Sequence, residues 1–138
     1  MTFPVPVAAV QPAIFTQNFT GIGPGAILNQ DYSLNTPSNP AARGSYIMVY
    51  GTGFGALQTP AIDGQIASDA TPLAASVTAT IGGIPADVKY AGAAPTLISG
   101  VAQINVWIPP DVQPNLFAPI TLKVGPYFTP DGVTVSIQ

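Results

Sequence analysis

The fold class is decided by the stretch Ser76-Val-Thr-Ala-Thr-Ile-Gly-Gly-Ile-Pro-Ala-Asp-Val-Lys-Tyr90. Apolar and polar residues alternate on both sides of Gly82-Gly83, and a two-residue glycine turn between alternating segments is typical of a β-hairpin. We therefore expect one strand over 76–81 and another over 84–90. The side chains that face the core should be Val77, Ala79 and Ile81 on the first strand and Ala86, Val88 and Tyr90 on the second.

Similar patterns continue on both sides of this hairpin. Over 102–108, Ile104, Val106 and Ile108 alternate with more polar neighbours, and Pro109-Pro110 ends the pattern. The continuous apolar run Tyr46–Tyr50 predicts a central strand. Further strands are expected over 120–124 and 133–137. Short strands separated by Gly and Pro turns indicate a β-sandwich.

The predicted fold is all-β: an immunoglobulin-like β-sandwich with an extended N-terminal strand or arm. Residues 43–138 supply six or seven expected strands, which suits such a domain. Residues 1–42 are then an N-terminal arm with additional strands, packed with the sandwich as one unit. The composition supports this choice, because only 7% of residues are charged and Glu is absent. Helix surfaces are normally built from charged residues and Gln.

The composition also excludes several functions. The chain has no His and no Cys, which removes Ser-His and Cys-His nucleophile pairs, zinc clusters and disulfides. Three cations and a net charge of −3 do not suit nucleic-acid binding. The chain contains no run of 18 apolar residues, so the sequence predicts no transmembrane helix. We therefore expect a protein that is not an enzyme, takes no cofactor, binds no nucleic acid and has no membrane span.

The first residues have an unusual pattern. In the extended stretch 2–10, Phe3, Val5 and Val7 share one face, while Pro4 and Pro6 leave one edge of the strand without N–H donors. Such a strand pairs mainly on its other edge. It is suited to adding a strand to a neighbour's sheet.

Two interpretations of residues 2–10 remain open. In the first, the strand is donated to another subunit, with Phe3, Val5, Val7 and Val10 as the assembly residues, and repetition builds a homopolymer. In the second, it pairs inside its own sandwich and the protein is a monomer.

Other motifs have ordinary explanations. The glycine runs Gly21–Gly25 and Gly51–Gly55 are predicted to be turns with positive φ, since no helix follows them to make a phosphate site. Asp63 and Asp69 share one loop and are the weak candidates for a metal, in the form of calcium, although no Asp-x-Asp-x-Asp-Gly spacing is present. Asn18-Phe-Thr20 is the one glycosylation sequon.

Most of the aromatic residues fall in strand patterns and are predicted to lie in the core. Trp107 is the exception, because it shares the polar face of its strand with Gln103 and Asn105. An outward Trp on such a face suggests an exposed contact with a partner chain, the N-terminal arm or a sugar.

Three blocks of sequence carry a family resemblance. They are Ala26–Gly44, Tyr50-Gly-Thr-Gly-Phe-Gly55, and Thr80–Pro95 continuing to Gln103-Ile-Asn-Val106. From about Val7 onward the chain resembles the Solibacter-type C-terminal domain found in large secreted acidobacterial proteins, and the last block is also similar to IPT/TIG immunoglobulin-like domains. The resemblance implies an extracellular or bacterial cell-surface location. That family has no established catalytic residues, so it implies none here.

These observations predict a non-enzymatic extracellular structural protein. It would assemble into a pilus-like cell-surface filament by donating the strand at about residues 2–10 to a neighbouring subunit. The alternative is a monomeric immunoglobulin-like adhesion or carbohydrate-binding module of a secreted protein, with a glycan or surface ligand at Trp107.

Overall fold

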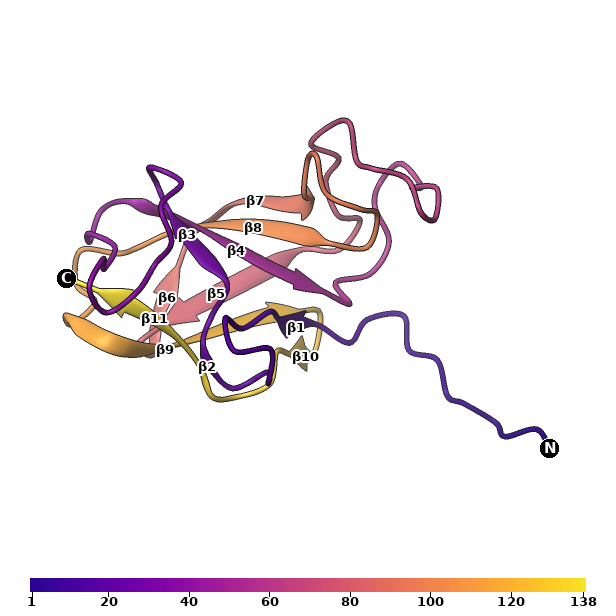
Figure 1. The fold of residues 1–138 in the computed structure, drawn as a ribbon, viewed down its shortest axis with the longest axis horizontal. Helices are drawn as coiled ribbons and strands as arrows, with labels where there is room; N and C mark the ends of the chain where they lie inside the picture. The colour runs from indigo at the N-terminus through magenta and orange to yellow at the C-terminus, as the bar shows by residue number, and fades with distance from the viewer.

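Two β-sheets packed face to face form the body of the protein, and the structure contains no helix (Figure 1). A computed structural model describes all residues, 1–138. The predicted all-β sandwich is thereby confirmed. The strands are β1 (Ala13–Ile14), β2 (Gly23–Pro24), β3 (Ile27–Asn29), β4 (Tyr46–Thr52), β5 (Val77–Ile81), β6 (Ile84–Ala86), β7 (Val88–Ala93), β8 (Ala102–Trp107), β9 (Asn115–Val124), β10 (Tyr127–Phe128) and β11 (Val133–Ile137).

The first sheet is built around β4. Its order is β1-β4-β8-β7, and β3 pairs with the same strand β4 further along. The expected central position of the Tyr46–Tyr50 run is confirmed, because β4 has antiparallel partners on both edges. The inward side chains of β4 and β8 face each other in register, with Ile47 opposite Val106 and Val49 opposite Ile104.

The second sheet has the order β2-β11-β9-β5-β6, and β10 pairs with β9. β9 is longer than the expected strand 120–124, because it starts at Asn115 and pairs first with β11 and then with β5. The edge strand β6 has only three residues, and its middle residue is Pro85. Proline cannot donate to a ladder, so this edge is poorly suited to a further strand.

The hairpin prediction at Gly82-Gly83 is right, and the strand after it differs from the prediction. Both glycines have positive φ, as a two-residue type I′ turn requires. The expected strand 84–90, however, divides at Asp87. Residues before Asp87 pair with β5 in the second sheet, and residues after it pair with β8 in the first. A single alternating pattern therefore crosses from one sheet to the other, because both sheets face the same core.

The core is aliphatic. Its 23 buried residues come from both sheets, and Phe54 is the one aromatic among them. Ile104, Val106 and Ile108 are fully buried, as their alternation predicts. The expectation that most aromatics lie in the core is wrong. Several lie at the surface instead, as in the cases of Phe3, Phe15, Phe19, Tyr32, Phe117, Tyr127 and Phe128. Small branched side chains fill the narrow space between two sheets more closely than rings do.

Residues 11–42 take part in both sheets. They supply β1 and β3 to the first sheet and β2 to the second, and Ala41 belongs to the core. A buried polar network ties this region to the last strand: Asn35 Nδ2 donates to Asn29 Oδ1 and to the Ser136 carbonyl, both at 2.9 Å, and the Ser136 N–H donates to Asn35 Oδ1 at 2.8 Å. All of these polar groups are paired, so the network stabilises the body.

Residues 1–10 belong to neither sheet. None of them makes a backbone hydrogen bond, and the first such bond runs from the Gln11 N–H to the Gly53 carbonyl at 2.9 Å. Figure 1 shows this segment, here called the N-terminal segment, leaving the body at the end opposite the C-terminus. In the stretch that follows, residues 11–20, only Ala13–Ile14 forms a strand, β1.

Candidate interaction site

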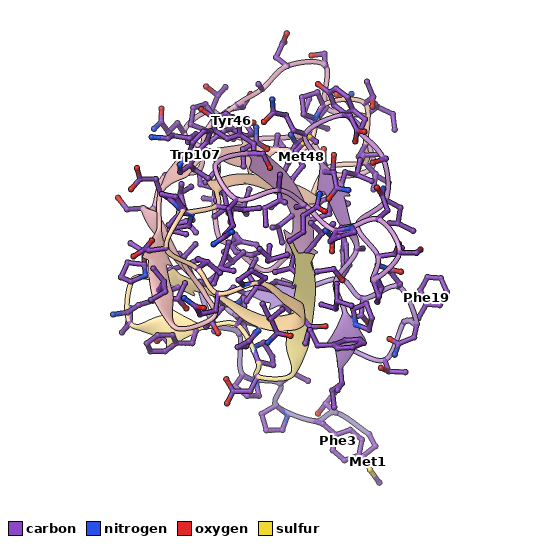
Figure 2. The ribbon with its side chains drawn as sticks, turned by 90° about the vertical axis from the view of Figure 1, so that its left-hand side faces the viewer. Met1, Phe3, Phe19, Tyr46, Met48 and Trp107 are labelled. Carbon is purple, nitrogen blue, oxygen red and sulfur yellow. The ribbon has the colours of Figure 1, made fainter.

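The N-terminal segment exposes a row of apolar side chains. Phe3, Val5 and Val7 are 75%, 78% and 92% exposed. Figure 2 shows Met1 and Phe3 projecting beyond the body with no other element beside them. Val10 behaves differently, because it is half-buried and packs against the core cluster. Of the four predicted assembly residues, three are thus free of contacts with the body and the fourth anchors the segment.

Residues 9–13, where the segment joins the body and which are here called its root, pack closely against glycines. A Cβ at Gly53 would collide with the carbonyl oxygen of Gln11, and one at Gly51 would collide with that of Ala13. Gly53 and Gly55 also have positive φ, at 79° and 92°. Gly53–Gly55 therefore has the turn geometry expected from the sequence, whereas Gly51 still belongs to β4, and Gly51 and Gly53 allow a close approach of two backbones. It fixes the direction in which the segment leaves.

A cavity of about 740 Å³ lies beside this root. It is formed by residues 52–57, the connection between β4 and β5, and the loop before β8. Ala9 is one of its lining residues, and the apolar part of its wall includes Phe54, Leu57, Ile62, Ile66 and Leu73. Sequence reasoning missed this cavity. Asp63 and Asp69 were expected to share a loop, and nothing in the sequence pattern indicates that this connection stands away from the sheet ends.

The weak metal candidates line the same cavity. Asp63 and Asp69 are both exposed, and Asp69 Oδ2 accepts a hydrogen bond from Ser68 Oγ at 2.9 Å. No group of three or more acidic, His or Cys side chains that could hold a metal ion occurs in the structure. The cavity has no Lys or Arg among its lining residues. Its lining combines apolar side chains and backbone groups with uncharged polar side chains of Thr, Ser and Gln and with two exposed carboxylates.

Trp107 lies on the outer face of the first sheet and is half-buried. Its ring meets that of Tyr46, on the neighbouring strand, edge to face, with centroids 4.7 Å apart and planes at 69°. Figure 2 shows the two rings together with Met48. Beside them, Gln103 Nε2 donates to Asn105 Oδ1 at 2.9 Å. These four side chains carry no charge and combine rings with amides, and the two rings are not coplanar. The charged Lys89 lies on β7, the strand that pairs with β8.

The tyrosines with shifted pKa values remain protonated near neutral pH. Burial raises the pKa of Tyr50, and the neighbouring Tyr32 adds to this effect. Burial also raises the pKa of Tyr90, whose hydroxyl donates to the Ala93 carbonyl at 2.6 Å. Neither phenol is shifted toward the range in which a general base operates.

Asn18 of the sequon is engaged within its own loop. Its Nδ2 donates to the Ile22 carbonyl at 2.9 Å, and its Oδ1 accepts hydrogen bonds from the N–H and Oγ1 of Thr20. Phe19 between them is 96% exposed and has a φ of 61°, a left-handed conformation that is uncommon for an aromatic residue. Figure 2 shows its ring projecting from the body.

Searches for similar proteins found no match among family models, curated proteins or solved structures. The structure also has no helix that is long and apolar enough to cross a lipid bilayer.

Proposed function

We propose that this protein is a non-enzymatic extracellular structural subunit with an immunoglobulin-like sandwich. In this proposal it builds a filament at the bacterial cell surface by donating its N-terminal segment to a neighbouring subunit. The observation that carries the proposal is that residues 1–10 make no backbone hydrogen bond, while Phe3, Val5 and Val7 are exposed.

The energetics favour transfer of this segment to an acceptor. Burying each of the three apolar side chains contributes about 1.5–3 kcal/mol. Association opposes this with the loss of rigid-body freedom and of chain entropy. Backbone pairing is available as well, because the N–H groups of Phe3, Val5 and Val7 have no partner. Donation thus uses groups that the isolated chain leaves in water.

The sequence of the segment opposes the second interpretation, in which it pairs within its own sandwich. To return along the body, the chain would need a tight turn after leaving it near Val10. Tight hairpin turns strongly favour Gly, Asn or Asp, and residues 1–10 contain none of them. Pro4 and Pro6 add stiffness in the extended conformation. These features support an outward strand.

The charge of the molecule supports self-association. Only three cations and six Asp are present in 138 residues, so two copies approach with little electrostatic repulsion. A donated segment makes a head-to-tail contact, and such contacts generate open filaments when the rotation between subunits does not close a ring.

The test compares assembly of the full chain with that of two variants. We expect the native chain to form filaments by electron microscopy, and a Phe3→Asp, Val5→Asp, Val7→Asp variant to remain a folded monomer by light scattering. Phe19→Asp is the matched control, because Phe19 is also exposed but lies on the body; it should assemble normally. Filaments formed by the triple variant would show that strand donation is wrong.

A second candidate is a monomeric immunoglobulin-like adhesion or carbohydrate-binding module. The uncharged group formed by Trp107, Tyr46 and the Gln103–Asn105 amide pair favours it, since rings and amides suit sugar binding. Its test is glycan-array binding by the native chain, which should be lost in Trp107→Ala and kept in Phe117→Ala. Absence of any bound glycan rejects this candidate.

A further inference from the structure

We infer that the cavity beside Phe54 and Leu57 is the acceptor for the N-terminal segment of a second copy. This inference rests on the proposed strand donation and adds its receiving site. The occupant is an extended, uncharged and apolar peptide, whose Phe3, Val5 and Val7 enter the cavity.

The backbone of the cavity wall matches this occupant. Residues 53–57 all line the cavity, and none of their five N–H groups donates a hydrogen bond within the chain. The wall therefore carries a surplus of donors. The edge of the segment that contains Pro4 and Pro6 lacks N–H groups at these residues but retains their carbonyls, so it carries a surplus of acceptors. An extended peptide can turn this edge toward the wall, so that its carbonyls satisfy donors that otherwise depend on water. Its other edge, with the N–H groups of Phe3, Val5 and Val7, then stays available for the ladder pairing of the proposed strand donation.

The side chains of the cavity match as well. Phe54, Leu57 and Leu73 form an apolar wall, and the exposed Ile62 and Ile66 lie at its edge. No cation lines the cavity, which disfavours an anionic ligand. The first 30 residues of the chain carry no charged side chain, so burying Phe3, Val5 and Val7 requires no charged side chain to be desolvated.

The occupant must come from another molecule. The hydrogen bond from Gln11 to Gly53 and the close backbone approach at Gly53 direct the segment outward. No residue between Thr2 and Val10 supplies the positive φ of a tight reversal. Within its own chain the segment is therefore directed away from the cavity, although Ala9 lines it.

The root and the cavity share one end of the molecule, since Ala9 lines the cavity. Reciprocal exchange between two copies would give a closed pair, and one-way exchange would give an open chain. The filament of the proposed function requires one-way exchange, whereas both modes place the segment of one copy in the cavity of another.

Cross-linking of full-length chains locates the contact, because the native protein has no Cys. A Val5→Cys chain is mixed with an Ala61→Cys chain, in which the new thiol lies at the cavity, and is oxidised mildly. The control partner is Gln113→Cys, which is also exposed and lies near the opposite end, two residues before the strand that pairs with Ile137. We expect a mixed disulfide with Ala61→Cys and none with Gln113→Cys. The reverse result, or equal yields, overturns the acceptor site.

Complementation separates this inference from the proposed function. Phe3→Asp, Val5→Asp removes donation, and Ile62→Asp, Ile66→Asp removes acceptance. Each variant alone should lose assembly, while their mixture should form one-to-one complexes. Ile22→Asp is the control, because Ile22 is 64% exposed, close to the 63% of Ile62, and lies outside the cavity. Normal assembly of the Ile62, Ile66 variant rejects the cavity but leaves donation intact. Normal assembly of the Phe3, Val5 variant rejects both.

Discussion

Residues 1–10 and residues 11–42 differ in how firmly they are bound to the body of the protein. Residues 11–42 have little regular structure, yet they contribute three short strands and the buried Asn29–Asn35–Ser136 network. Residues 1–10 have a strand-like pattern, yet they contact the body only at their root. The difference teaches that side-chain amides can fix an irregular stretch, whereas an alternating stretch without a partner strand stays outside the sheets.

The largest expected effect comes from breaking the network of the second region. Asn35→Ala leaves Asn29 Oδ1 and the Ser136 N–H unpaired in the interior, and it removes one of the two hydrogen bonds to the Ser136 carbonyl, which the Ala41 N–H still reaches. We expect a loss of about 4 kcal/mol in the free energy of unfolding, measured by urea denaturation.

Asn39→Ala is the control for this substitution. Asn39 donates to Ser33 Oγ and the Leu34 carbonyl but is exposed, so we expect a loss below about 1 kcal/mol. Equal losses for the two variants would contradict the role given to burial.

The next effect concerns the junction between the two regions. Gly53→Ala forces a left-handed alanine and a clash with the Gln11 carbonyl. We expect a loss of about 3 kcal/mol in the free energy of unfolding. Gly64→Ala is a matched control, because Gly64 has the same φ of 79° and open space around it, so it should lose only about 1–2 kcal/mol. Similar losses at both positions would remove the close approach as a cause.

A smaller effect, on the pH dependence of stability, is expected at Asp31, in the loop after β3. Hydrogen bonds from the side chain and backbone of Ser33 lower the pKa of Asp31 below its ordinary value of 3.8. A lowered pKa stabilises the folded protein fully above pH 3.8, and this contribution disappears as the pH falls through the folded pKa.

Unfolding curves of the native chain and Asp31→Asn should therefore converge in acid. Carboxyl titration by NMR should also show the pKa of Asp31 rising toward 3.8 in Ser33→Ala. A difference between the two unfolding curves that persists at low pH would contradict this assignment.

The smallest effect on stability is expected in the first region. The triple Asp variant of Phe3, Val5 and Val7 changes only exposed side chains. At concentrations where the chain is a monomer, we expect its free energy of unfolding to change by less than about 0.5 kcal/mol, by urea denaturation. A larger loss would mean that the N-terminal segment contributes to the stability of its own body and is not reserved for a neighbour.

Sequence reasoning succeeded where one physical signal dominated. The Gly82-Gly83 turn and the alternation at Ile104, Val106 and Ile108 depend on local geometry and burial, and both are confirmed. It failed at Asp87, because an alternating pattern is the same whichever of two facing sheets it enters. It also misplaced the aromatics, since a strand pattern does not tell which face meets solvent when the other face is filled by Ile and Val.

The candidate site was predicted in part. Residues Phe3, Val5 and Val7 were identified by alternation with proline, but the cavity was not, because it is made by loops from distant parts of the chain. The network at Asn35 was missed for a similar reason. Asn in a turn-rich stretch is typical of local hydrogen bonds, and its partner Ser136 lies 101 residues away.

The short edge strand β6 has a consequence for the material that this chain can form. Its central Pro85 interrupts the outer row of donors, and the exposed edge of β7 is capped over Ala91 and Ala93 by residues 71–73. Edge-to-edge pairing of the kind that produces amyloid is therefore disfavoured along the side of the sandwich formed by β6 and β7. If copies join as proposed, through the N-terminal segment, this side would add no thickness to the assembly.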